Sequence, residues 1–290
     1  MIPIGLTHHR QKSAKDVLRG LYSLPVRHYH TVRPRAPVGY CLTSSYGGIL
    51  SRAYATRSGP GGSPVMTIYW ILLGLNAIPF LYWQSLTLNK DNQGRRKFMD
   101  RAAVSLATWE QGRYETLLTS AFTHTGLAHF GFNMFTMYTF CRILSGVPAL
   151  TGAHVVAISI GSAVAGSLGY IMLQGQLAYN SSNPRRFGAR IQPAIGASGM
   201  VMGIAGVATC FFPRSQMLVF PIPFPIPLWA VTIGFVIVDA YYLDSSTSRT
   251  AHAGHLGGLA FGVLYYALGL RRLAPFHSGI SRAFGQWRWR

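Results

Sequence analysis

Long apolar stretches alternate with short polar ones from residue 66 to residue 270. A helix needs about 20 mostly apolar residues to cross the core of a bilayer, and six of the stretches come close to this length. The six predicted spans are 66–88, 117–140, 152–173, 194–212, 228–243 and 251–270. The pattern therefore predicts an all-α polytopic membrane protein, with a six-transmembrane-helix bundle in residues 65–272.

Small residues mark the faces on which these predicted helices should pack. The span 152–173 is rich in glycine, alanine and serine, which let membrane helices approach closely. Gly199 and Gly203 share one face of the span 194–212, and Gly254, Gly258 and Gly262 share one face of the span 251–270. We expect these two faces to press against each other.

The connections between the spans are polar or rich in proline. Residues 89–115 contain six basic side chains and Trp109, and we expect them to form a polar loop at the membrane interface. Residues 221–227 alternate proline with apolar residues, which excludes a helix and predicts an extended polyproline connector.

Residues 1–64 differ from the rest of the chain because they contain nine basic residues and one acidic residue. Alanine, valine and leucine recur at helical spacing around residues 14–21, with basic residues off that face. This pattern is typical of a mitochondrial transit peptide, and we expect cleavage between Tyr54 and Ala55. The alternative is an ordinary basic tail. A second basic tail is expected at residues 273–290.

The composition agrees with lipid as the surrounding solvent. The chain is 49% hydrophobic and 11% charged, whereas soluble domains contain about 25% charged residues. Its formal net charge is +19, but the basic residues lie in the leader, the loops and the tail, so we expect membrane lipid and no nucleic acid as a partner. Three widely spaced cysteines disfavour a disulfide framework or a zinc site.

Four polar residues are candidates for a catalytic site because they fall at similar depth on one side of the predicted bundle. Ser198 begins the fourth span, His255 lies near the start of the sixth, and His129 and Asn133 share one face of the second. A serine hydroxyl becomes a useful nucleophile when a neighbouring base accepts its proton. His255 is the candidate base, and His129, Asn133 and the Ser198 backbone N–H are candidate donors to an oxyanion.

Each of these signals taken alone has a structural alternative. A Gly-Ala-Ser-Gly stretch commonly serves helix packing, and single histidines and asparagines commonly hydrogen-bond between membrane helices. The roles of His124 and His252 stay open at this level, and Asp239 is interpreted as a residue of the membrane interface. Apart from Asp244, no acidic residue lies close to His255 in the sequence. We therefore expect a Ser–His dyad and not a triad.

The motifs resemble those of the rhomboid family of intramembrane serine proteases. The resemblance covers residues 112–262, and it rests on three motifs: His124-x4-His129-x3-Asn133, Gly196-Ala197-Ser198-Gly199 and Ala253-Gly254-His255-Leu256-Gly257-Gly258. Met202 after the second motif and His252 before the third are most similar to the mitochondrial branch. The chain departs from many members at Met202, where they have a tyrosine that stacks on the base, and from many mitochondrial members at Ala251, where they have an aspartate.

The resemblance implies a serine endopeptidase of the mitochondrial inner membrane that cleaves single-pass transmembrane proteins and needs no metal or cofactor. It also implies a nucleophile at Ser198, a base at His255 and oxyanion donors at His129 and Asn133. The first alternative is a catalytically silent rhomboid-like binder of transmembrane clients. The second is a transporter that uses the intramembrane histidines.

Overall fold

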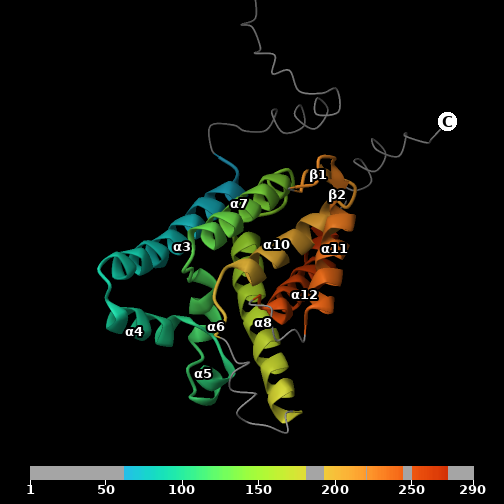
Figure 1. The fold of residues 1–290 in the computed structure, drawn as a ribbon. Coiled ribbons are helices and arrows are strands. Elements are labelled where there is room, and N and C mark those ends of the chain that lie inside the picture. Colours follow the sequence, from blue (N-terminus) through green and yellow to red (C-terminus); the bar gives the residue numbers. More distant parts are fainter. Residues whose placement is uncertain (1–61, 181–192, 220, 244–249, 274–290) are drawn as a thin grey trace, which may run out of the picture. The chain divides into compact units, whose positions relative to one another are not determined.

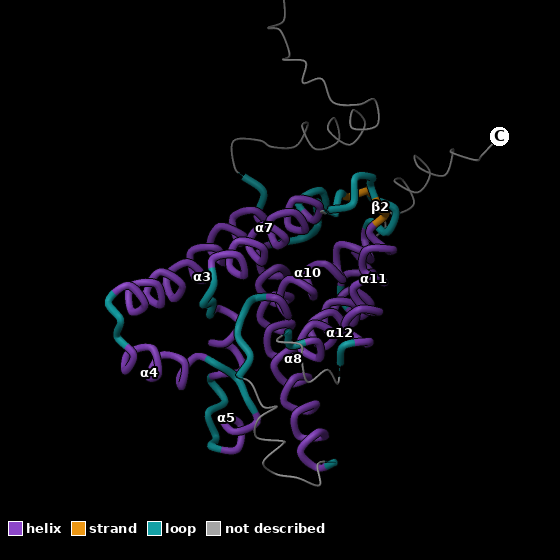
Figure 2. Tube along the Cα trace, in the orientation of Figure 1, coloured by secondary structure: helices purple, strands orange, loops and turns teal. Residues whose placement is uncertain are grey.

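The computed structural model describes residues 62–180, 193–219, 221–243 and 250–273. The predicted leader with its cleavage site between Tyr54 and Ala55 lies outside these residues, apart from its last three positions, and so does nearly all of the predicted tail. The described chain is mostly helical, as Figures 1 and 2 show. Its elements, in chain order, are α3 (Pro64–Leu88), α4 (Asn92–Ala102), α5 (Leu106–Glu110), α6 (Thr116–Thr119), η1 (Ser120–Phe122), α7 (Leu127–Leu144), α8 (Gly152–Tyr179), α10 (Ser198–Phe211), β1 (Gln216–Met217), β2 (Ile226–Pro227), α11 (Leu228–Tyr241), α12 (His252–Leu268) and η2 (Leu270–Leu273).

Five of the six predicted spans correspond to single helices, namely α3, α8, α10, α11 and α12. Two of them, α3 and α8, are long and apolar enough to cross a membrane, while α10 and α11 are shorter apolar helices. The connector 221–227 is non-helical as expected in its described residues, although its last two residues form β2, which pairs with β1 in an antiparallel hairpin. The helical class is confirmed, and six membrane crossings stay a prediction.

The predicted continuous second span, 117–140, is wrong. Residues 123–126 separate η1 from α7, and both Thr123 and Gly126 have extended backbones. Two β-branched threonines and a glycine within four residues lower the helix propensity of this segment, which explains the interruption. As a result, α7 begins at Leu127, and His129 lies in its first turn.

The polar loop 89–115 has more structure than we expected, because it contains the helices α4 and α5. The Asp91 carboxylate caps α4 by accepting a hydrogen bond of 2.8 Å from the Gly94 N–H, and the Ser105 side chain caps α5. Between the two helices, Val104 exchanges backbone hydrogen bonds of 3.0 and 2.8 Å with Ala194. The loop therefore holds the segment that leads into α10.

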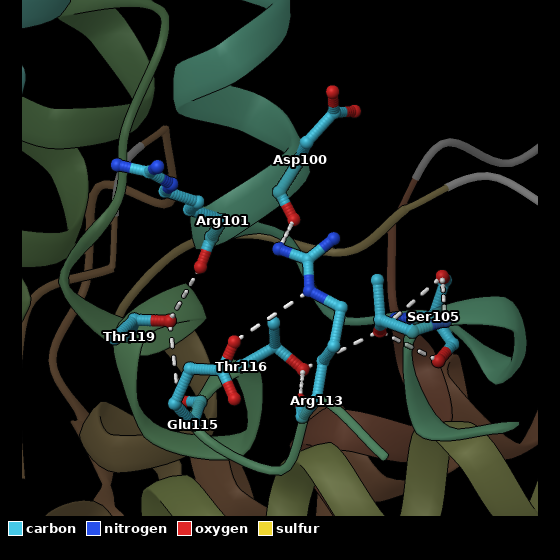
Figure 3. Close-up of polar contacts among 8 residues, drawn as sticks. Asp100, Arg101, Ser105, Arg113, Glu115, Thr116 and Thr119 are labelled. Carbon is cyan, nitrogen blue, oxygen red and sulfur yellow. Dashed lines mark hydrogen bonds and ion pairs between the residues drawn. The ribbon is translucent and has the colours of Figure 1, made fainter. Parts of the chain in front are cut away.

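Arg113 connects the two ends of this loop (Figure 3). Its guanidinium donates to the backbone carbonyl of Asp100 at the end of α4 and pairs with the Glu115 carboxylate at 3.6 Å. The hydroxyl of Thr119 donates to the backbone carbonyl of Arg101 at 3.2 Å. These contacts fasten α4 to α6, and α6 packs against α8.

Helices α8, α10 and α12 form the centre of the fold, where they lie side by side (Figure 1). The backbones of Gly199 and Gly258 almost touch, because a Cβ added at Gly258 would lie 2.1 Å from the Gly199 carbonyl oxygen. One turn further along, Gly203 and Gly262 repeat this contact with the same 2.1 Å separation. The expected contact between the two glycine faces is confirmed, and its register shows that α10 and α12 run in the same direction.

The distribution of apolar residues is that of a protein surrounded by lipid. Large apolar side chains are exposed along α3, α7 and α11, for example those of Ile78, Phe135 and Ile237. Serine side chains such as those of Ser159 and Ser162 are buried in the centre. Exposed apolar surface of this extent marks an interaction surface, and lipid fits its position on the outer helices.

The contact between Gly258 and Gly199 leads to a stability prediction. Gly258→Ala places a methyl group against the Gly199 carbonyl, so α10 and α12 must separate, and we expect a loss of about 1–3 kcal/mol in the free energy of unfolding. Gly74→Ala in α3 is the matched control, because no heavy atom lies within 4 Å of its added Cβ. Unfolding midpoints in detergent should fall for Gly258→Ala only, and equal midpoints for both variants would contradict the packing argument.

Candidate active site

Ser198 is the first residue of α10, and a glycine turn brings the chain to it. Gly196 has a φ of 118°, which residues with side chains rarely adopt. A Cβ at Gly196 would also lie 2.6 Å from Cε1 of His129, so both the backbone and the space require glycine. The Gly196 N–H donates to the Ser120 carbonyl at 2.8 Å. The expected position of Ser198 in the first turn of its helix is confirmed.

The side chain of His124 accepts a hydrogen bond from the same turn. Its side chain is fully buried, and its Nε2 accepts a hydrogen bond of 3.3 Å from the backbone N–H of Ala197, the residue before Ser198. Its ring meets the ring of His129 edge to face, with the two centroids 5.0 Å apart. The role of His124, which the sequence left open, is therefore to position the turn that carries Ser198.

His129 and Asn133 lie one turn apart at the start of α7, as expected. The ring of His129 lies beside Gly196, which is two residues before Ser198 in the sequence. The Asn133 side chain is buried, and its Nδ2 donates to the carbonyl oxygen of His129 at 2.8 Å. An amide nitrogen has two hydrogens, so this bond to its own helix leaves Asn133 a second one to donate.

His255 has a carboxylate partner, which the sequence reasoning missed. Asp239, near the end of α11, lies with its two carboxylate oxygens 3.0 and 3.2 Å from Nδ1 of His255. One of those oxygens also lies 2.7 Å from Nδ1 of His252. The interpretation of Asp239 as an interface residue is wrong, since only 3% of its surface is exposed.

The signal for Asp239 was present in the sequence. Asp239 is the one acidic residue within the six predicted spans. An ionisable residue in such a position is expensive to bury and typically pairs with a partner, so it marks a candidate functional group. The partner could not be identified from sequence, because 16 residues separate Asp239 from His255.

The helix packing places Ser198 and His255 in neighbouring positions. Gly199 lies against Gly254, with an added Cβ 3.3 Å from the Gly254 carbonyl oxygen, and these two glycines directly adjoin Ser198 and His255 in the sequence. Both residues are half-buried and lie at the N-terminal ends of α10 and α12. The C-terminal end of α11 brings Asp239 to the same place.

A pocket adjoins Ser198. It is small and partly open to the outside, and it is lined by residues that include Ser120, Ser167, Gly196 and Gly254. The hydroxyl of Ser167 donates to the Leu117 carbonyl at 2.8 Å and lies 3.4 Å from the hydroxyl of Ser120. The site therefore combines a serine, a histidine with a carboxylate partner, and a hollow with hydroxyl groups in its wall.

Comparison with known proteins agrees with this arrangement. A family model described as the Rhomboid domain matches residues 111–272, which is more than half of the chain. The chain is 29% identical over 202 residues to Rhomboid protein 1, mitochondrial, of Saccharomyces cerevisiae, covering 68% of this chain and 52% of that protein. It is 26% identical over 207 residues to RHOMBOID-like protein 12, mitochondrial, of Arabidopsis thaliana, covering 68% and 57%.

The human Presenilin-associated rhomboid-like protein, mitochondrial, is 24% identical over 158 residues, which cover 53% of this chain and 37% of that protein. The chain thus spans about half the length of the curated relatives it matches. The family model extends from the loop before α6 through α12 into η2, and it includes every residue of the site described above. The chain therefore belongs to the rhomboid family, in its mitochondrial branch, and its membrane is the mitochondrial inner membrane.

Proposed function

We propose that this protein is an intramembrane serine endopeptidase that hydrolyses peptide bonds in single-pass transmembrane proteins. Ser198 is the nucleophile, His255 is the general base, and Asp239 positions His255. The observation that carries the proposal is the contact of 3.0 Å between the Asp239 carboxylate and Nδ1 of His255, on a helix packed against the one that begins with Ser198. The expected Ser–His dyad is thereby extended by a carboxylate.

The carboxylate selects the form of His255 that can act as a base. A neutral imidazole has one N–H group and one acceptor nitrogen, and a carboxylate beside Nδ1 holds the hydrogen on that atom. Nε2 is then the acceptor for the proton of the Ser198 hydroxyl. Many family members stack a tyrosine on the base at the position of Met202, and Asp239 supplies a different support here.

The reaction follows the general course of acyl transfer. The Ser198 oxygen attacks the scissile carbonyl carbon while its proton passes to Nε2 of His255, and the collapse of the tetrahedral intermediate returns that proton to the leaving amine. Water then attacks the acyl-enzyme in the same manner and releases the new carboxylate. The pocket beside Ser198 has hydroxyl groups from Ser120 and Ser167, which suit it to hold that water.

We assign the stabilisation of the oxyanion to three groups. The backbone N–H of Ser198 belongs to the first turn of α10, where N–H groups have no partner within the helix and the helix dipole favours negative charge. The ring of His129 lies beside Gly196, two residues before α10, and Asn133 follows one turn later on α7. Together they would surround an oxygen bound next to Ser198.

The membrane arrangement completes the proposal. We place α3, α7, α8, α10, α11 and α12 across the bilayer as a six-helix bundle, with lipid against the exposed apolar side chains of the outer helices. The site then lies below one surface, where a transmembrane substrate can reach it from the side. The exposed apolar faces of α3, α7 and α11 support this arrangement.

A cleavage assay in liposomes tests the function. The purified protein is reconstituted with a library of single-pass transmembrane segments that have small residues near one end, and the products are identified by mass spectrometry. We expect cleavage near one membrane surface by the wild type and none by Ser198→Ala. Stable binding of these segments without any cleavage by the folded wild type would favour the client-binding alternative.

A further inference from the structure

Three side chains that can bind a metal ion meet between α11 and α12. Asp239 comes from α11, while His252 and His255 come from the first turn of α12. The ligand atoms of the three residues all lie within 4.8 Å of one another. Asp239 and His252 are buried, and His255 is half-buried. Such a set differs from a cluster of acids on a surface, because it is enclosed and contains two imidazoles.

The donor set suits zinc and its neighbours among the first-row metals. Two imidazole nitrogens and one carboxylate oxygen are ligands that Zn²⁺ binds at about 2.0–2.2 Å, whereas Ca²⁺ and Mg²⁺ prefer sites made of oxygen. Ligand atoms around a tetrahedral Zn²⁺ are therefore about 3.3 Å apart. The contacts from Asp239 to the two Nδ1 atoms are 2.7, 3.0 and 3.2 Å, and all ligand atoms lie within 4.8 Å of one another. To bind a tetrahedral ion, the carboxylate therefore moves outward by a few tenths of an ångström, and the two imidazoles approach each other by up to about 1.5 Å.

An aromatic neighbour holds the ring of His252, and the ring of His255 is partly exposed. The ring of Tyr242 stacks on that of His252 with a centroid separation of 5.7 Å and an angle of 23° between planes. His252 and His255 are three residues apart on one helix, so they point to the same side. The side chain of His255 is 18% exposed, compared with 9% for His252, so His255 is the ligand that an ion reaches first.

We propose that Asp239, His252 and His255 form a site for a single Zn²⁺ ion, and that the bound ion switches the enzyme off. Inhibition by Zn²⁺ rests on the proposed protease function, whereas the binding of Zn²⁺ does not. A metal bound to Nδ1 of a neutral imidazole leaves the remaining hydrogen on Nε2. His255 in that state has no acceptor for the Ser198 proton, so the nucleophile is not activated.

Metal binding is tested first, without any use of activity. The full chain with Ser198→Ala is titrated with Co²⁺, which gives a visible absorption band in a four-coordinate site, and Zn²⁺ is then added to displace it. Background binding is removed by replacing the histidines outside the described residues with glutamine, namely His8, His9, His28, His30 and His277. We expect one Co²⁺ ion per chain.

Loss of one ligand should weaken this binding strongly. His252→Ala should raise the dissociation constant by more than the roughly 10–100-fold that is typical for loss of an outer-shell partner. His154→Ala is the matched control, because His154 lies on α8 and bonds to the hydroxyl of Tyr265 at 3.0 Å, apart from the cluster. Equal Co²⁺ affinity in His252→Ala and His154→Ala, or no band at all in the parent protein, would overturn the site.

Inhibition is tested second, on protein with an intact Ser198. We expect Zn²⁺ to slow the labelling of Ser198 by a fluorophosphonate probe at least about tenfold, and a chelator to restore the rate, since a base without its acceptor nitrogen cannot activate serine. In His252→Ala, the Zn²⁺ concentration for half-inhibition should rise in parallel with the Co²⁺ dissociation constant. Co²⁺ binding with an unchanged labelling rate would refute the switch, whereas absence of labelling in metal-free wild type would count against the protease itself.

Discussion

Replacement of Ser198 by alanine is expected to abolish the covalent labelling of this protein by a fluorophosphonate probe. Such probes react with a serine whose hydroxyl is activated by a base. Ser198 begins α10 and precedes Gly199, which packs against Gly254, the residue before His255. His255→Ala should lower the labelling rate by at least about 10³-fold, because it removes the base and leaves the hydroxyl at its ordinary reactivity. Labelling is followed by fluorescence in a gel, with the protein folded in detergent.

Ser145→Ala is the matched control for this experiment. Ser145 is the C-cap residue that follows α7, and its hydroxyl donates to the Arg142 carbonyl at 2.6 Å, so its loss should leave labelling at the wild-type rate. If Ser198→Ala and Ser145→Ala label equally, Ser198 is not the nucleophile.

If the wild type also binds transmembrane segments without labelling, the client-binding alternative is favoured. A transporter would tolerate Ser198→Ala in a transport assay and fail with His255→Ala.

Asp239→Asn should produce the second large effect, a loss of about 10²–10⁴-fold in the labelling rate with the fold retained. An asparagine amide can donate to Nδ1 of His255, which moves the ring hydrogen to Nε2 and removes the acceptor for the Ser198 proton. The substitution keeps the volume of the side chain, so the unfolding midpoint in detergent should change far less than the rate. Asp239→Glu retains a carboxylate and should recover part of the rate.

If Asp239 has only a structural role, a different result is expected. In that case the rate and the unfolding midpoint would fall together, and Asp239→Glu, which is longer, would be at least as damaging as Asp239→Asn. Asp100→Asn is the matched control, since the Asp100 side chain is exposed and its contact with Arg113 uses only the backbone carbonyl. Labelling by Asp239→Asn at the rate of Asp100→Asn would show that the carboxylate does not position the base.

Tertiary structure decided several features because they depend on residues that are far apart in the chain. His124 accepts a hydrogen bond from the backbone of Ala197, 73 residues later, and Val104 pairs with Ala194, 90 residues later. Neither pairing has a local pattern, since any buried donor can satisfy any acceptor that the fold brings close. The break at residues 123–126 could not be predicted either, because the apolar residues on both sides of it form the pattern of one continuous span.

The contrast between the glycine faces and Asp239 shows what the sequence by itself determined. Gly199, Gly203, Gly258 and Gly262 repeat at the spacing of one helix turn, so their common face, and then their contact, could be predicted from helix geometry alone. Ser198 and His255 each adjoin one of these glycines in the sequence, so a Ser–His pair could be predicted from the same geometry, and it stays a prediction. Asp239 is a single residue on a third helix, and its partner depends on how α11 packs against α12. Periodicity along a chain specifies the face of a helix, whereas the neighbour of a single side chain is specified only when the helices have packed.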